Sequence, residues 1–191
     1  MKVIFCAISL FLTVNLVFSQ NTTELELKKV GIYNFLSVGT VFGSALNEKP
    51  APFSLLNEFN IRTGKHFAIG MVTGLEMLNE MVAPVGGNVK LLFTTASDNI
   101  FFTGLSGGYS VPLEKPEIID NYYEVINAYG GGMFNAETGI VYPLKKELSL
   151  FVAAGYRYNE LRYKRKDWSF QSVNRTMYYN RVSLRIGLVF H

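Results

Sequence analysis

The sequence predicts an all-β protein, an eight-stranded antiparallel transmembrane up-and-down β-barrel that follows a cleaved signal peptide. Three observations predict this fold. Period-two segments rich in aromatic and β-branched residues recur from residue 33 to the end of the chain. Short and long connections alternate between these segments, and their apolar face bears aromatic residues near both ends.

The N-terminal segment is expected to be an export signal. Lys2 precedes an apolar run over residues 3–18, and Ser19 offers a small residue at the cleavage position. The run is short for a membrane-spanning helix of ~20 residues and is followed at once by polar residues. We therefore expect a signal peptide over residues 1–19 and one barrel domain over residues 20–191. Cys6 is the only cysteine, so the mature chain would contain no disulfide.

Eight segments alternate between apolar and polar or small residues, as expected for strands with two different faces. They cover residues 33–42, 53–62, 66–78, 88–94, 100–111, 130–143, 148–163 and 176–190. The connections 63–65, 96–99 and 144–147 are short, whereas 43–52, 79–86, 112–129 and 164–175 are longer. Short turns on one rim and long loops on the other are typical of outer-membrane barrels. An even strand count then places both termini on the short-turn, periplasmic rim.

The two faces of each strand differ in chemistry. In the last segment Val182, Leu184 and Ile186 share one face, and Arg181 and Arg185 share the other. The apolar face also holds two predicted aromatic girdles, which favour contact with the two interfaces of a bilayer. The first girdle, near the short turns, consists of Phe67, Phe101, Tyr142 and Phe190, and the second, near the long loops, of Tyr109, Tyr156, Tyr158 and Tyr178.

The polar face predicts a network of charges inside the barrel. Its members are Glu58, Lys90, Glu137 and Arg185 in a lower layer and Glu76, Arg157 and Arg181 in an upper layer. Charges enclosed in a narrow barrel must pair with one another or with water. We expect a plugged interior, because eight strands leave little room beyond the side chains. Two alternatives remain open: a narrow channel for ions or small solutes, and a soluble lipocalin-like carrier whose apolar face is inside.

Several function classes find no support in the sequence. The histidines are His66 and His191, and no cysteine cluster is present, so no metal site of ordinary spacing is predicted. No nucleophile and base are suitably placed for catalysis, so we expect neither enzyme activity nor a cofactor. The net charge of +3 is small and the basic residues are scattered, which does not indicate nucleic-acid binding.

The long loops are candidate contact surfaces. The loop over residues 112–129 is rich in acids, and the next long loop contains Lys164, Arg165, Lys166 and Trp168. Such residues favour a surface partner or the phosphates of lipopolysaccharide, whereas a solvated loop is the simpler interpretation.

The closing segment, YYNRVSLRIGLVF over residues 178–190, resembles the last strand of outer-membrane β-barrel domain proteins of Bacteroidota. The junction between Ser19 and Gln20 is similar to signal cleavage sites of that group. This resemblance implies a location in the bacterial outer membrane, contact with its lipid, and insertion by the barrel assembly machinery. It also implies that Phe190 is read as the insertion signal.

Overall fold

The computed structural model describes residues 30–43, 52–78, 80–95, 99–113, 124–145, 147–166 and 171–190. Within these ranges, no helix is long and apolar enough to cross a membrane. The predicted signal peptide and its cleavage site lie outside the described residues and stay predictions. The strands are β1 (Val30–Gly43), β2 (Phe53–Thr63), β3 (Phe67–Met77), β4 (Met81–Thr94), β5 (Ile100–Pro112), β6 (Glu124–Tyr129), β7 (Gly131–Lys145), β8 (Leu148–Lys166) and β9 (Ser172–Phe190).

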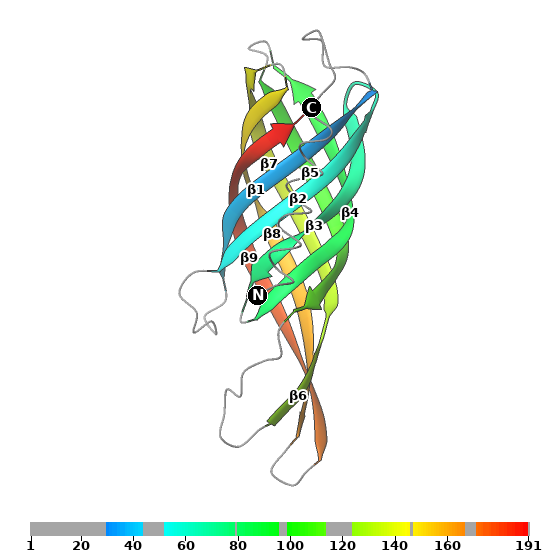
Figure 1. The fold of residues 1–191 in the computed structure, drawn as a ribbon, viewed down its shortest axis with the longest axis vertical. Coiled ribbons are helices and arrows are strands. Elements are labelled where there is room, and N and C mark those ends of the chain that lie inside the picture. Colours follow the sequence, from blue (N-terminus) through cyan, green and yellow to red (C-terminus); the bar gives the residue numbers. More distant parts are fainter. Residues whose placement is uncertain are drawn as a thin grey trace.

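Eight of these strands close into a barrel. Each pairs antiparallel with its neighbour in the order β1-β2-β3-β4-β5-β7-β8-β9, and β9 pairs again with β1. The closing ladder runs from Asn34 opposite Phe190 to Gly43 opposite Arg181. Closure gives every strand two partners and leaves no sheet edge along the wall. The predicted all-β, eight-stranded antiparallel barrel is therefore confirmed (Figure 1).

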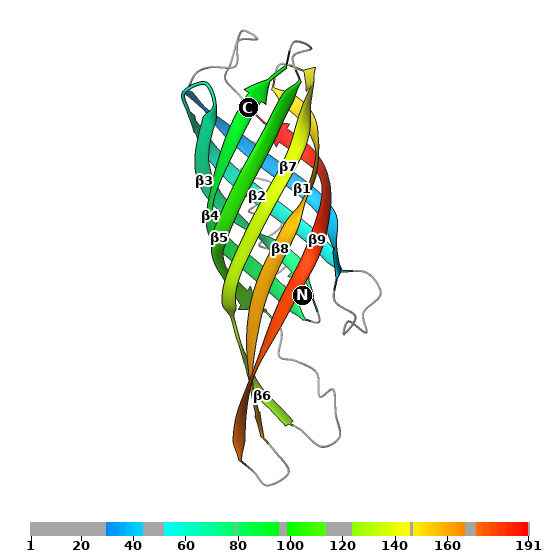
Figure 2. The same cartoon turned by 180° about the vertical axis from the view of Figure 1, so that it is seen from behind.

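A three-stranded extension projects from one end of the barrel. β8 and β9 are 19 residues each and stay paired from Leu148 opposite Phe190 to Lys166 opposite Ser172. The short strand β6 pairs with the far part of β8, from Tyr129 opposite Arg162 to Glu124 opposite Lys166. β6 thus continues the line of β7, which it meets at Gly130. Figure 2 shows this extension narrowing away from the barrel, with the C-terminus at the opposite end.

Three predicted boundaries were wrong. The fourth strand begins at Met81 and not at residue 88, so the link after β3 is much shorter than the predicted loop 79–86. Pro84 and Gly86 resemble loop residues, yet Pro84 lies opposite Ser110 and Gly86 opposite Gly108 in the ladder with β5. The predicted loop 112–129 contains β6, and the predicted loop 164–175 is partly strand because β8 and β9 continue past the barrel.

Candidate functional site

The barrel wall exposes its apolar side chains and encloses its charged ones. On β9, Leu184 and Ile186 are 48% and 49% exposed, whereas Arg181 and Arg185 are 1% and 4% exposed. Val152 on the neighbouring β8 is 47% exposed. Exposing such a continuous apolar surface to water would be unfavourable, since soluble proteins seldom show patches of this size. This orientation excludes a carrier whose apolar face lines the interior.

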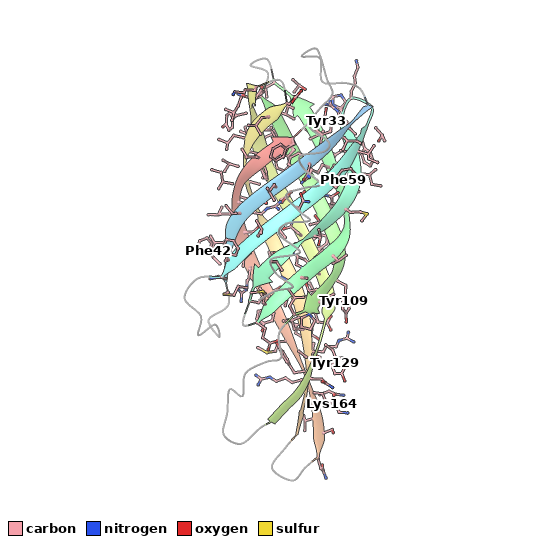
Figure 3. The ribbon with its side chains drawn as sticks, viewed as in Figure 1. Tyr33, Phe42, Phe59, Tyr109, Tyr129 and Lys164 are labelled. Atoms are coloured by element: carbon pink, nitrogen blue, oxygen red, sulfur yellow. The ribbon has the colours of Figure 1, made fainter. Side chains whose placement is uncertain are left out.

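Aromatic side chains are exposed at both ends of this apolar band. Every predicted girdle residue lies on a strand, and Phe190 and Tyr158 are half-buried while the others are exposed. The Tyr158 and Tyr178 rings stack with their centroids 6.3 Å apart. In Figure 3, Phe42 and Tyr109 lie toward the end of the barrel that bears the extension. The sequence analysis missed three exposed aromatic residues at strand ends, Phe42, Phe53 and Phe93, although their outward parity could have identified them.

The four charges of the lower layer meet inside the barrel and form a closed ring of ion pairs. The Lys90 ammonium lies 2.7 Å from Glu58 and 2.5 Å from Glu137. The Arg185 guanidinium lies 2.8 Å from Glu58 through one nitrogen and pairs with Glu137 through another. Each cation contacts both carboxylates, so the two positive and two negative charges balance. A buried charge network is stable only when such partners are present.

Polar side chains that the sequence analysis overlooked complete this ring. Asn88 donates a hydrogen bond to Glu58, Asn135 donates to Glu137, and Ser37 accepts one from Arg185. All three are buried on the inner face. They carry no charge, so a search for titratable residues passes over them, yet Asn88 and Asn135 each lie two residues from a charged member of the ring, which was a usable signal.

An aromatic cluster closes the barrel between the ionic ring and the end of the barrel opposite the extension. The Phe35, Phe102 and Phe151 rings contact one another edge to face, with centroids 5.3 to 6.0 Å apart. The Lys90 ammonium lies over the Phe35 ring at 5.0 Å and the Phe102 ring at 4.7 Å. This cation–π contact joins the ionic ring to the aromatic cluster.

The upper layer is enclosed but less evenly paired. Glu76 lies 3.0 Å from Arg157 and accepts hydrogen bonds from Ser54 and Asn159. Arg181 is also buried, and its guanidinium lies 5.1 Å from the centroid of the Tyr179 ring. The structure therefore brings Glu76 and Arg157 together but gives Arg181 no ion-pair partner among the described residues.

A second apolar cluster closes the barrel at the end that bears the extension. It consists of Val41, Leu78, Val82, Leu161, Tyr163 and Tyr179. Burial raises the pKa of the Tyr163 hydroxyl, and the nearby Tyr179 and Glu80 raise it further. Tyr163 therefore stays neutral at ordinary pH, and its ring closes this end without adding a charge.

A groove with a volume of about 530 Å³ lies on the three-stranded extension. It is lined by Tyr129, Glu160, Arg162, Tyr163, Lys164, Asn174, Thr176 and Tyr178. Glu160 lies 2.7 Å from Arg162. Figure 3 shows Tyr129 and Lys164 on the extension, beyond the barrel wall. Lys164 thus lies in a strand and not in the predicted loop, while the acidic residues 114–123 of the other loop lie outside the described residues.

No group of metal-ligating side chains forms a possible metal site within the described part of the chain. His66 has its Nδ1 atom 3.0 Å from the Leu92 carbonyl oxygen and stacks on Phe93, which explains its position at the rim. His191 lies outside the described residues.

Comparison with known proteins supports the fold. No protein-family model and no curated protein matches the chain. Among solved structures, the outer membrane protein OprG from Pseudomonas aeruginosa is similar, with a TM-score of 0.62 and 12% identity over 85% of this chain and 96% of that chain. The outer membrane protein AlkL, determined in lipid bilayers, has a TM-score of 0.55 and 9% identity over 89% of this chain and 93% of that chain. The chain thus resembles small outer-membrane barrels, and the narrower resemblance to Bacteroidota proteins stays a prediction.

The ionic ring predicts that the loss of one buried glutamate destabilises the protein much more than the loss of a glutamate on the extension. We expect Glu137→Gln to lower the free energy of unfolding by about 3–5 kcal/mol, because it leaves buried cations undercompensated. Glu160→Gln removes a carboxylate from a pair on the extension whose Arg162 side chain is 62% exposed, so solvent screens the pair and the loss should be much smaller. Urea unfolding in detergent micelles measures both. Equal losses in the two variants would mean that the ring does not stabilise the barrel.

Proposed function

We propose that the chain is an integral protein of the bacterial outer membrane, non-enzymatic, with a plugged interior and a structural or surface-interacting role. The single observation that supports this proposal is the orientation of the wall, with apolar side chains outward and charges enclosed. Aromatic residues at both ends of the apolar band are what the two interfaces of a bilayer favour. The strand count and the chain direction favour termini in the periplasm, which would place the extension on the cell surface.

If the apolar band contacts lipid, introducing an arginine in its middle should lower the stability of the protein, whereas introducing one on the extension should not. Leu184 and Val173 are almost equally exposed, at 48% and 49%. We expect Leu184→Arg to lower the free energy of unfolding in lipid vesicles by about 2–4 kcal/mol, because the new charge would lie in hydrocarbon. Val173→Arg should change it by about 0.5 kcal/mol or less.

Fractionation of cells tests the same proposal directly. The wild-type protein should be recovered with the outer membrane and should migrate faster on gels when it is not heated. Recovery as a soluble periplasmic protein, or equal effects of the two arginine variants, would contradict the proposed location.

The interior supports a plug over a channel. One end of the interior holds the aromatic cluster and the ionic ring, and the other end holds the second apolar cluster. Between the two ends lie an apolar cluster of Leu56, Val72 and Met133 and the upper layer around Glu76. These layers block an ion in two ways, because the apolar layers cannot hydrate it and the charges of the lower ring are already paired with one another.

A plugged barrel should be electrically silent. We expect the purified wild-type protein to give no conductance steps in a planar lipid bilayer, and Glu137→Ala to stay silent, because the aromatic cluster still closes the barrel. Reproducible steps from the wild-type protein, abolished by heat denaturation, would favour the channel hypothesis instead.

The groove on the extension supports a contact with lipopolysaccharide, whose sugars bear phosphates. It begins at Tyr178 in the aromatic girdle, so a lipid headgroup held there could keep its acyl chains on the barrel wall. Arg162 and Lys164 provide positive charge, while Asn174 and Thr176 offer hydrogen bonds. Tyr129 is about half exposed and offers a ring face to a sugar.

This contact predicts that the double variant Arg162→Ala, Lys164→Ala binds lipopolysaccharide at least about tenfold more weakly, since each basic residue near an anionic surface contributes about 1 kcal/mol. Lys145→Ala, an exposed lysine at the other end of the barrel, is the matched control and should bind normally. Titration of the refolded protein with lipopolysaccharide measures the affinity. Unchanged binding by the double variant would remove the groove as the contact site.

A further inference from the structure

Two buried arginines face each other in the upper layer of the barrel. Arg157 on β8 and Arg181 on β9 are directly opposite in the ladder that joins these strands. Both point inward, and each is 1% exposed. Like charges directly opposite in a sheet repel each other, and burial strengthens the repulsion by lowering the local dielectric constant. Their juxtaposition therefore requires compensating negative charge.

The described residues supply only part of this compensation. Among the described residues, Glu76 is the only carboxylate within ion-pair distance of either arginine, and it contacts Arg157. The Arg157 N–H groups are not aligned on that carboxylate as hydrogen bonds, and no guanidinium nitrogen of Arg181 has an acceptor in the described part of the chain. Glu76 already accepts hydrogen bonds from Ser54 and Asn159. Six buried guanidinium nitrogens thus lack a hydrogen-bond acceptor.

A comparison of the two layers shows how much charge is missing. The lower ring has two cations and two carboxylates and is neutral. Counted over the residues that the structure describes, the upper layer has two cations and one carboxylate, an excess of one positive charge. Glu80 does not balance it, because its carboxylate lies toward the extension and interacts with Tyr163 and Tyr179. Apolar clusters lie on both sides of the layer.

We propose that Arg157 and Arg181 together bind one small monovalent anion of halide size inside the barrel. One negative charge neutralises the layer, and the two guanidinium groups provide N–H donors that no described side chain uses. A halide ion suits this layer because it accepts several hydrogen bonds and has no N–H or O–H group that would need an acceptor. A phosphate or a carboxylate ligand is larger and would bring an apolar or second charged part into an enclosed layer.

Bromide is a suitable probe because it replaces chloride and scatters X-rays anomalously. The full-length protein, refolded from urea into detergent micelles, is compared in sodium bromide and in sodium gluconate at constant ionic strength. We expect the folding equilibrium constant to rise about tenfold for each tenfold increase in bromide above half-saturation, since the anion binds the folded state alone. Crystals grown with bromide should show an anomalous peak between the Arg157 and Arg181 guanidinium groups.

Three variants separate the site from general salt effects. Arg181→Met should abolish the bromide dependence, and Lys164→Met, which removes a half-buried lysine of the extension, should retain it. Glu76→Gln raises the excess to two positive charges and should lower the half-saturating bromide concentration. If Arg181→Met does not fold, the bromide dependence of Glu76→Gln and the anomalous signal in wild-type crystals still test the proposal. Ordered water without anomalous signal at this position, or the same bromide dependence in Arg181→Met and the wild type, would overturn the proposal.

Discussion

Closure of the barrel is the constraint on which the rest of the structure depends. Once β9 pairs with β1, every strand of the wall has a partner strand on both sides, and successive side chains point alternately outward and inward. The alternation forces all the charges of one face into a space bounded by eight strands. They can reach only each other there, so the sequence must provide acids and bases in nearly equal numbers.

The interior is built in layers because charges and apolar groups cannot share one layer at low cost. The aromatic cluster needs space that small residues provide. A Cβ atom on Gly139 would lie 2.7 Å from the Phe102 ring, and one on Gly187 would lie 2.7 Å from the Phe151 ring. Both glycines are inner-face positions where a larger side chain would displace a phenylalanine. The lower ring is then supported on one side by these rings and on the other by Leu56, Val72 and Met133.

The extension gives the molecule a second surface with different chemistry. β8 and β9 continue in one ladder from the apolar band to a region where outward positions hold Arg162, Lys164 and Asn174. β6 pairs with the far part of β8 and covers that edge of the extension. The same two strands therefore join a wall suited to lipid with a groove suited to polar headgroups, and the change occurs at the Tyr158 and Tyr178 pair.

The sequence by itself determined the strand content and the division of each strand into two faces, because both depend on a period of two residues that is local. It also identified seven of the nine charged side chains that are buried in the described part of the chain, all but Arg62 and Glu80. Only the tertiary structure decided that Lys90 and Arg185 each contact Glu58 and Glu137, that Arg181 has no ion-pair partner among the described residues, and that β6 joins β8. Strand tilt and register set these pairings over separations of up to 127 residues, and no local pattern encodes them. The start of β4 was missed for the same reason, since its ladder with β5 outweighs the turn-like Pro84 and Gly86.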